Sequence, residues 1–467
     1  MASTLSVASK DSLPAGRVAP GPAARGFAGS LPDFRDDKIG FLMGALRDYG
    51  EIVRFRFGPK VIHLLQHPDH VKLVLGRNHL NFAKASRGFN KLKSLLGNGL
   101  VTSDGSFWQR QRRIAQPAFH RKRIAAFAET MTAVAEEFAD RWEPYAESGE
   151  PLDLYPEMNR LTFNVVMRTL LGADLPPADF DAVSHGLEVS LNHMNRNIYR
   201  LFDVPSSLPT RRNREFRAGV QAMDDVVYKV IAERRKDSSD RIDLLSMMMQ
   251  ARDEETGEQM LDEHLRDEVM TIMLAGHETT AIALTWTWYL LSTHPREARR
   301  LRAELAEVLG GRTPTIEDVP RLPYTTQVAH EALRLYPPLW AFSRLVKEEF
   351  ELGGYQIPAN STLFLSPYVT HRHPEFWENP EGFDPERFAV DRKAGRHPYA
   401  FLPFGGGPRN CIGSNFAILE MQMALATLAQ RFRPDLLPGH HVEVAPILTL
   451  RPNAGMPMVL QRVNGAA

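Results

Sequence analysis

The stretch Phe404-Gly405-Gly406-Gly407-Pro408-Arg409-Asn410-Cys411-Ile412-Gly413 holds the single cysteine of this 467-residue chain. Its consecutive glycines let the backbone approach a bulky, flat group closely. An apolar, helix-forming segment follows, so we expect the sulfur near free backbone N–H groups and the positive end of a helix dipole, with Arg409 close by. These neighbours favour a thiolate. The stretch therefore predicts a ligand sulfur, although a lone cysteine is more often a small buried apolar side chain.

Composition excludes several classes of protein. One cysteine permits no intrachain disulfide, which fits a reducing cytoplasm. Lys plus Arg and Asp plus Glu number 56 each, so overall charge favours neither nucleic acid nor an acidic membrane surface. Residues 1–30 contain no apolar run that would serve as a signal peptide or membrane anchor. We expect a cytoplasmic protein with no membrane anchor, a flexible segment over residues 1–30 and one domain over 31–467, because no linker or repeat interrupts the rest.

Periodicity predicts a mostly α protein with small β-sheets (α+β). Apolar residues recur at helical spacing, most clearly over residues 124–142, 216–235 and 262–294. Short strand patterns cluster over residues 51–66, with a hairpin turn at Gly58-Pro59, and again over 350–367 and 442–462.

The predicted helix over residues 262–294 is about 50 Å long, enough to cross the molecule. It is apolar on most faces, but His277, Glu278 and Thr279 interrupt the apolar run and argue against a membrane span. A buried carboxylate is costly without a purpose. Taken alone, the segment also fits a helix bent by a threonine that bonds back to a carbonyl.

Two helix pairs add to this pattern. Glu331 and Arg334 stand three residues apart and share a helix face, and the double proline at 337–338 ends that helix. Trp108 and Arg112 stand four apart, so an indole N–H and a guanidinium point the same way, as they would to hold a carboxylate. Singly, each pair is commonplace.

Together and in this order, these motifs resemble the signature set of the cytochrome P-450 family over roughly residues 30–462. The set comprises Trp108 with Arg112, the hexapeptide 275–280, Glu331 with Arg334, the tetrapeptide Pro385-Glu386-Arg387-Phe388, and the cysteine stretch, which matches without departure. The resemblance implies the cytochrome P-450 fold: one large helical domain with a β-rich side and a long central helix over the haem.

The resemblance also implies site residues. Cys411 would be the axial thiolate of a b-type haem (heme b, iron protoporphyrin IX), whose electron donation favours cleavage of the dioxygen O–O bond. Glu278 and Thr279 would relay protons as catalytic residues. The remaining haem-binding residues would be Ala275 and Gly276 on the central helix, Trp108, Arg112, Arg344 and Arg409 around the propionates, and Phe404, Gly405 and Gly413 in the cysteine stretch. Glu331, Arg334 and Arg387 would form a buried structural charge triad.

The implied reaction is hydroxylation or epoxidation of a lipophilic small molecule with O2. Its two electrons would come from NAD(P)H through a separate reductase system. We expect a ferredoxin or flavodoxin to dock on the basic cluster Arg110, Arg113, His120, Arg121, Lys122 and Arg123, although the same cluster also fits a solvated basic face.

By matching positions, the substrate pocket would be lined by Val101, Ala275, Leu339, Trp340, Ala341, Ile447 and Leu448, with contributions from residues 191–202. These apolar side chains suit a fatty acid, terpenoid, steroid or polyketide. Asn192, His193, Met194 and Asn195 would anchor a polar group or face solvent. The hexapeptide 275–280 is similar to that of bacterial fatty-acid hydroxylases.

Two alternatives stay open. A peroxygenase or rearranging enzyme of the same fold usually lacks the acid and threonine pair present here. A non-catalytic haem carrier or sensor would keep Cys411 and need neither Glu278 nor Thr279.

Overall fold

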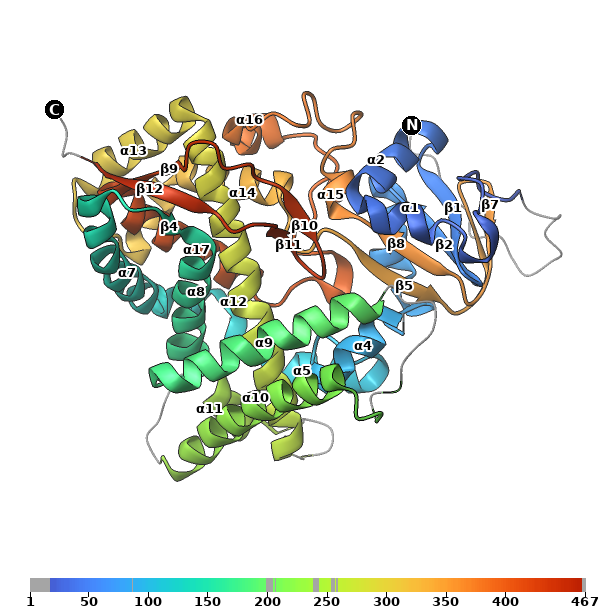
Figure 1. Cartoon of the computed structure of the whole chain (residues 1–467), viewed down its shortest axis with the longest axis horizontal. Helices are drawn as coiled ribbons and strands as arrows, with labels where there is room; N and C mark the ends of the chain where they lie inside the picture. The colour runs from blue at the N-terminus through green and yellow to red at the C-terminus, as the bar shows by residue number, and fades with distance from the viewer. Residues whose placement is uncertain are drawn as a thin grey trace.

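The computed structural model describes residues 17–85, 87–198, 205, 207–237, 243–252, 257 and 259–463. A large helical part lies beside a smaller β-rich part that contains the N-terminal strands (Figure 1). The predicted class, mostly α with small β-sheets, is confirmed. Among the described residues, no helix is both long and apolar enough to cross a membrane.

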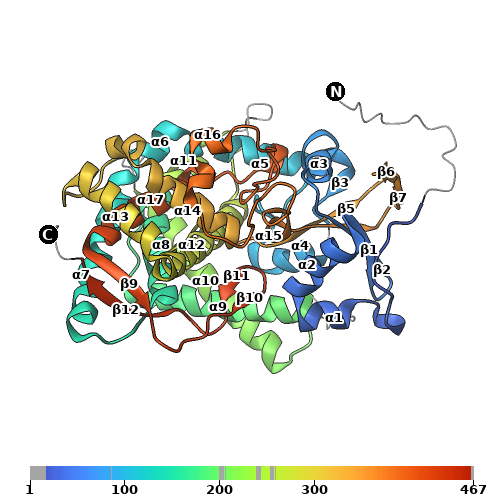
Figure 2. The ribbon, with the colours of Figure 1, turned by 90° about the horizontal axis from the view of Figure 1, so that it is seen from above.

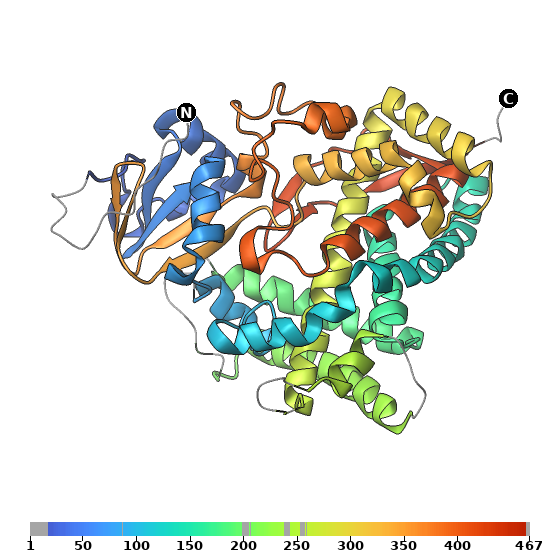
Figure 3. The ribbon, with the colours of Figure 1, turned by 180° about the vertical axis from the view of Figure 1, so that it is seen from behind.

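Helix α12 (Asp262–Thr293) runs through the middle of the helical part, as the sequence predicts for residues 262–294 (Figures 1 and 3). It packs against α8 (Leu154–Leu170), α10 (Arg211–Lys236), α14 (Pro323–Leu335) and α17 (Ser414–Arg431). Most of its side chains are buried, because neighbours surround it on nearly every side.

The helix predicted over residues 124–142 is two helices. Helix α6 (Arg121–Ala126) ends at Phe127, whose N–H closes a tight turn by donating to the Ile124 carbonyl at 3.0 Å. Helix α7 (Ala128–Ser148) begins immediately afterwards. The Phe127 ring packs edge-on against Phe416 of α17, so the break serves a tertiary contact that periodicity alone does not reveal.

The remaining helices connect these elements. The α-helices are α1 (Leu31–Asp36), α2 (Lys38–Tyr49), α3 (Pro68–Lys72), α4 (Arg87–Leu96), α5 (Gly105–Ala115), α9 (Pro177–Ile198), α11 (Leu244–Gln250), α13 (Pro295–Leu309), α15 (Pro367–Thr370) and α16 (Val390–Lys393). Short 3-10 turns are η1 (Gly26–Ala28), η3 (His79–Asn81), η4 (Gln116–Phe119), η5 (Ile316–Arg321), η6 (Pro385–Phe388) and η7 (Gly407–Arg409), and η2 (Leu73–Arg77) is a π-helical turn.

The β-rich part is a five-stranded sheet in the order β1-β2-β8-β5-β3. Its strands are β1 (Ile52–Phe57), β2 (Lys60–Leu65), β8 (Thr362–Leu365), β5 (Phe342–Val346) and β3 (Phe82–Ala83). The predicted hairpin is confirmed, since Phe57 pairs with Lys60 across Gly58-Pro59, and only β2 and β8 run parallel. Figure 2 shows α1 and α2 beside this sheet.

Three smaller sheets complete the fold. They are β4 (Leu152–Asp153) with β12 (Pro457–Arg462) and β9 (Phe432–Leu436), β6 (Phe350–Leu352) with β7 (Tyr355–Ile357), and β10 (Val444–Pro446) with β11 (Leu450–Pro452). The β10–β11 hairpin is tied to α12 because Trp286 Nε1 donates to the Leu450 carbonyl at 2.8 Å.

Residues 17–30 run along the sheet, where Arg54 N–H donates to the Pro20 carbonyl at 2.7 Å. The expected flexible segment over residues 1–30 falls partly on residues 1–16, which lie outside the described residues. The domain boundary at residue 30 stays a prediction.

Candidate functional site

The cysteine loop is a tight turn, and its conformation at position 407 requires glycine. Gly407 has φ 66°, and a Cβ there would lie 1.8 Å from the Leu75 carbonyl oxygen. The Cys411 N–H donates to the Phe404 carbonyl at 2.9 Å, which closes the loop on itself. Helix α17 begins at Ser414, with Gly413 as its N-cap, so Cys411 precedes the helix.

Cys411 is accessible to solvent although protein surrounds it. Burial raises the pKa of its thiol, and this outweighs the opposing effects of the Gly413 backbone N–H, Arg112 and Lys84. The expectation that neighbouring groups alone favour a thiolate is therefore wrong for the protein without a metal. A coordinated cation would supply the missing stabilisation, because a thiol that binds a metal is deprotonated. The sulfur is thus surrounded by protein atoms and still reachable from solvent.

Helix α12 has an open face in an otherwise buried stretch. Ala275 is exposed, and Gly276 and Thr279 are partly exposed, although Glu278 and His277 beside them are buried. Small or short side chains on one face of a central helix leave room for a ligand. Thr279 Oγ1 donates to the Ala275 carbonyl at 2.7 Å, which is the back-bonding alternative that the sequence left open.

Four cations gather beside the cysteine loop with a single carboxylate among their nearest ionised partners. Lys84, Arg344 and Arg409 lie close enough for their positive charges to repel one another. Arg112 interacts electrostatically with Lys84 and with Cys411. The carboxylate is that of Asp104, which attracts Lys84 and Arg344. Burial lowers the pKa of all four cations, that of Arg344 to about 10. Unpaired buried charge is costly, so this cluster fits an anionic group with about two carboxylates, as the haem propionates are.

Further contacts hold these cations in place. Arg112 Nη1 donates to the Asn410 carbonyl at 3.0 Å, directly before the cysteine. The guanidinium of Arg409 stacks on Trp108, with Cζ 4.0 Å from the ring centroid. The sequence predicted the arginines and the tryptophan but missed Lys84, which shares no helix face with any of them.

Glu278 is bound away from Thr279. Its Oε1 accepts hydrogen bonds from Thr449 Oγ1 at 2.9 Å and from Arg451 Nε at 2.7 Å, and a second Arg451 nitrogen also donates to it. Glu278 is 2% exposed. The acid and the alcohol are thus neighbours in sequence with different partners, and no local sequence pattern indicates that Thr449 or Arg451 binds Glu278.

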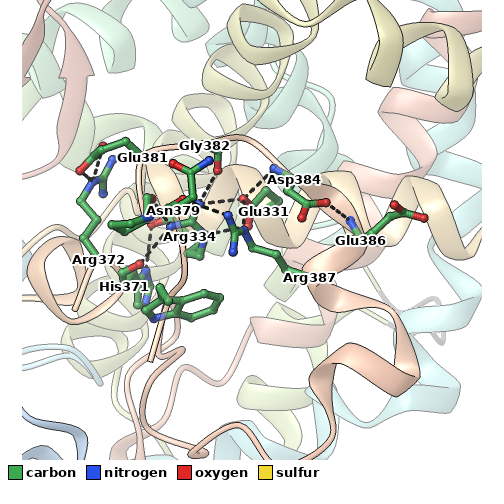
Figure 4. A network of polar contacts seen from close by, with 12 residues as sticks. Glu331, Arg334, His371, Arg372, Asn379, Glu381, Gly382, Asp384, Glu386 and Arg387 are labelled. Carbon is green, nitrogen blue, oxygen red and sulfur yellow. Dashed lines mark hydrogen bonds and ion pairs between the residues drawn. The ribbon is translucent and has the colours of Figure 1, made fainter. Parts of the chain in front are cut away.

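The predicted charge triad is assembled where α14 meets the segment that contains η6 (Figure 4). Arg334 donates to both oxygens of Glu331 at 2.7 Å, and Arg387 Nε lies 3.3 Å from Glu331 Oε1. Arg334 also donates to the backbone carbonyls of His371, Pro380 and Gly382. All three charged side chains are buried, so the network ties α14 to the segment that leads to the cysteine.

The predicted pocket residues divide into two groups. Val101, Ala341, Ile447 and Leu448 are partly buried, and Leu339 is exposed. Trp340, by contrast, is 1% exposed and packs in the core beside the five-stranded sheet, with its Nε1 donating to the Ile447 carbonyl at 3.0 Å. Its indole is therefore packed inside this core and away from solvent.

The segment 191–202 is described only in part. Leu191 and Met194 are buried in the core, whereas Asn192 is exposed. His193 stacks on Phe216 of α10 at 4.5 Å between ring centroids. Residues 199–202 lie outside the described residues.

The basic cluster expected to receive a redox partner lies on and between α5 and α6. Arg113, His120, Arg121, Lys122 and Arg123 are exposed, and Arg110 is partly buried. The cluster follows the helix of Trp108 and Arg112 and is therefore close to the cysteine loop in the fold.

Residues 19–457 match the cytochrome P-450 family. Cyclooctatin synthase of Streptomyces melanosporofaciens is 39% identical over 87% of this chain and 88% of that protein. Cyclooctat-9-en-7-ol 5-monooxygenase of the same organism is 37% identical over 85% of each chain. Pentalenene oxygenase of Streptomyces avermitilis is 34% identical over 87% of this chain and 89% of that protein.

The fold is also similar to that of a solved structure. The crystal structure of the cytochrome P450DA haem domain superposes with a TM-score of 0.89 at 27% identity, covering 97% of this chain and 99% of that chain. The chain belongs to the cytochrome P-450 family, as its motifs predict, and is a monooxygenase. Membership of the family implies a haem cofactor.

Proposed function

We propose that this enzyme uses a b-type haem ligated by Cys411 to insert one oxygen atom of O2 into a lipophilic cyclic molecule. One observation carries the proposal. The solvent-accessible thiol of Cys411 lies beside a cluster of four cations and one carboxylate. When bound, the haem supplies the activation of O2. The protein supplies ligation, orientation, exclusion of water and protons.

Lys84, Arg112, Arg344 and Arg409 orient the cofactor by binding its propionates. Their lowered pKa values reflect burial without matching negative charge, and propionates would restore the balance. Arg409 is held by the Trp108 ring, so its guanidinium has little freedom to turn away. Ala275 would leave space for a bound group beside this face of α12, because its side chain ends at Cβ.

Thr279 and Glu278 handle protons. Thr279 lies on the accessible face of α12, where its hydroxyl can donate a proton and be reprotonated from water or an acid. Glu278 is the nearest acid in sequence and reaches Thr279 only by leaving its present partners. The haem carrier or sensor alternative has no use for such a pair.

A terpenoid is the substrate class that we favour among those the sequence left open. The relatives are named for pentalenene and for cyclooctat-9-en-7-ol, names that denote an alkene and a cyclic alkenol. The partly buried apolar residues Val101, Ala341, Ile447 and Leu448 suit such a molecule, which is held mainly by burial of hydrocarbon. The fatty-acid similarity of the hexapeptide carries less weight than these relatives.

Electrons are proposed to arrive from NAD(P)H through a separate reductase and a ferredoxin or flavodoxin. The basic residues on α5 and α6 support docking of an acidic partner near the cysteine loop.

The decisive experiment is the absorption spectrum of the reduced, carbon-monoxide-bound protein. We expect a strongly red-shifted Soret band that Cys411→Ala abolishes. A folded, haem-loaded wild type without this band, or survival of the band in the variant, would refute ligation by Cys411. Spin-state titration with cyclic terpenoids, followed by product analysis with surrogate redox proteins, then separates a monooxygenase from a carrier. Repeating the assay with hydrogen peroxide alone tests the peroxygenase.

A further inference from the structure

Histidines and carboxylates gather where three distant segments of the chain meet in the β-rich part. They are Glu51 directly before β1, His67 and His70 on and beside α3, and His373 and Glu375 after α15. A ring nitrogen of His373 and carboxylate oxygens of Glu51 and Glu375 all lie within 4.8 Å of one another. The ring centroid of His67 lies 5.5 Å from that of His70 and 5.9 Å from that of His373. Imidazole and carboxylate groups are ligands that zinc takes in proteins.

The backbone at this meeting point is fixed by its own hydrogen bonds. The Gln66 N–H donates to the Glu51 carbonyl at 3.0 Å, and Thr370 Oγ1 donates to the Gln66 carbonyl at 3.3 Å. The His373 N–H donates to the Thr370 carbonyl, also at 3.3 Å. Gln66 directly precedes His67, so it ties all three segments together. Side chains borne on such a backbone are partly organised for a ligand before it arrives, which lowers the cost of binding.

His373 is the buried member of the group. The residue is 5% exposed, and among the described residues its Nε2 has no hydrogen-bond partner. A buried polar atom without a partner is costly, and a metal ion would satisfy it. Nδ1 of the same ring accepts the Glu375 N–H at 3.3 Å, which is long for a hydrogen bond. A metal at Nε2 places the ring proton on Nδ1, so this weak contact would open. Burial lowers the pKa of His373 below its ordinary value, so the ring is neutral near pH 7, the form that binds metals.

Glu51 and Glu375 bring two carboxylates close together. Among the residues that the structure describes, neither of them forms an ion pair with a lysine or an arginine. The partner of Glu375 is His67, whose Nε2 lies 3.9 Å from Glu375 Oε2. Both glutamates reach solvent, so a hydrated ion can approach them from outside. A divalent cation between the two carboxylates would balance both negative charges.

We propose that Glu51, His373 and Glu375 form a binding site for a divalent metal ion of the zinc type. Zinc binds nitrogen and oxygen at about 2.0–2.2 Å in tetrahedral geometry, so its ligand atoms stand about 3.4 Å apart. The separations of up to 4.8 Å close to this value when the two accessible glutamates rotate inward. Water fills the fourth position. Neutral His67, whose Nδ1 accepts the Asp69 N–H at 3.2 Å, carries its proton on Nε2 and so orients the Glu375 carboxylate.

The ion would act as a structural cross-link between α3, the start of β1 and the segment after α15. Helix α3 continues into η2, whose Leu75 carbonyl oxygen lies against Gly407 of the cysteine loop. Binding to the folded protein alone then stabilises it by mass action. The inference is independent of the proposed function, because none of the three ligand residues has a role in it.

The test is calorimetric titration of the tag-free holoenzyme with zinc chloride. We expect saturable binding of one ion by the wild type and an unfolding midpoint that rises with zinc. Glu51→Gln combined with Glu375→Gln keeps the size of two accessible side chains and removes their charges. This variant should bind zinc at least about tenfold more weakly, because loss of even an outer partner of a metal ligand costs about 10- to 100-fold in affinity. His373→Asn should weaken binding as strongly, and the glutamate variant keeps the test informative if His373→Asn folds poorly.

The matched control is His441→Asn combined with Glu443→Gln. It removes the same kinds of side chain from an exposed pair, in which His441 Nδ1 lies 3.5 Å from Glu443 Oε1. Zinc affinity should equal that of the wild type. Magnesium and calcium chloride should bind the wild type more weakly than zinc does, because these ions prefer all-oxygen sites. Anomalous diffraction at the zinc absorption edge should place the ion between Glu51, His373 and Glu375.

Equal zinc affinity in the wild type and in the double glutamate variant would overturn the inference. An anomalous peak at a different place on the protein would also overturn it, as would a wild type without saturable binding. The reduced carbon-monoxide spectrum reports on Cys411 and not on this site. Failure of the proposed function is therefore seen separately from failure of the metal site.

Discussion

Arg334 and Glu331 face each other on α14 through two hydrogen bonds of 2.7 Å, and both side chains are fully buried. Glu331 Oε1 also accepts the Asp384 N–H at 3.0 Å. The pair therefore joins the helix to a loop, and its value lies in fixing the position of that loop rather than in the attraction between the two charges alone.

Arg334→Ala is expected to destabilise the protein by about 3–5 kcal/mol, because it removes the partner that binds both oxygens of the buried Glu331 and leaves Arg387 Nε, at 3.3 Å, as the remaining cation of the triad. Denaturant unfolding and the ratio of haem to protein measure the effect. Arg300→Ala is the matched control, since its pair with Glu386 is roughly half exposed and should contribute about 0–1 kcal/mol. Equal losses in the two variants would contradict a special role for the buried pair.

Acid should destabilise the fold through His371. Burial lowers its pKa to about 3, and its Nε2 accepts the Leu402 N–H at 2.9 Å, which requires a neutral ring. Since the folded pKa lies below the ordinary value of about 6.5, this contribution is present above pH 6.5 and is lost as the pH falls towards 3, at about 1.4 kcal/mol per pH unit. Unfolding free energies measured from pH 7 to pH 5 should have a shallower slope in His371→Asn. An identical slope would exclude His371.

Gly407→Ala should disrupt the cysteine loop. The added Cβ would meet the Leu75 carbonyl oxygen at 1.8 Å, in addition to the strain of φ 66°. Gly395→Ala is the control, because φ there is 81° with no atom within 4 Å, so only backbone strain of about 1 kcal/mol is expected. Haem content should fall in the first variant and not in the second.

Thr279→Ala should keep the red-shifted carbon-monoxide band and divert electrons from product to hydrogen peroxide, because its hydroxyl is lost from the accessible face of α12. Thr287→Ala is a close comparison. Its hydroxyl makes the same kind of bond, to the Ala283 carbonyl at 2.7 Å, but is fully buried. Peroxide yields that rise equally in both variants would remove Thr279 from proton delivery.

Arg113→Glu with Arg121→Glu should slow reduction by an acidic ferredoxin and flatten its dependence on ionic strength. Stopped-flow reduction at several salt concentrations provides the measurement. The control is Arg299→Glu, which reverses an exposed charge on α13 and is expected to leave the rate of reduction unchanged. A rate and salt dependence equal to those of the wild type would mean that the basic cluster is merely solvated.

The sequence predicted features that depend on residues close together in the chain. The cysteine loop, the long α12 and the hairpin at Gly58-Pro59 follow from glycine placement and periodicity, and the family resemblance joins them. The sequence does not predict the contact of Arg451 with Glu278, because the two residues are 173 positions apart and no local spacing links them. It does not predict Lys84 as a member of the cation cluster for the same reason.

The charge state of Cys411 illustrates a different limit. The neighbours of Cys411 in the sequence predict a thiolate, because they lower the pKa of the thiol. Burial of the sulfur raises that pKa by more than the neighbours lower it, so the net shift is upward. The helix begins at Ser414, three residues after the cysteine. A local pattern identifies the ligand atom without fixing its protonation.

The crowding of Lys84, Arg112, Arg344 and Arg409 has a consequence for production of the protein in cells. Like charges held together with Asp104 as the one carboxylate of the cluster repel, so the folded chain is penalised until an anionic cofactor arrives. Binding to the folded state alone then shifts the folding equilibrium by mass action. The intracellular supply of haem thus becomes a determinant of how much folded enzyme accumulates and how much is degraded.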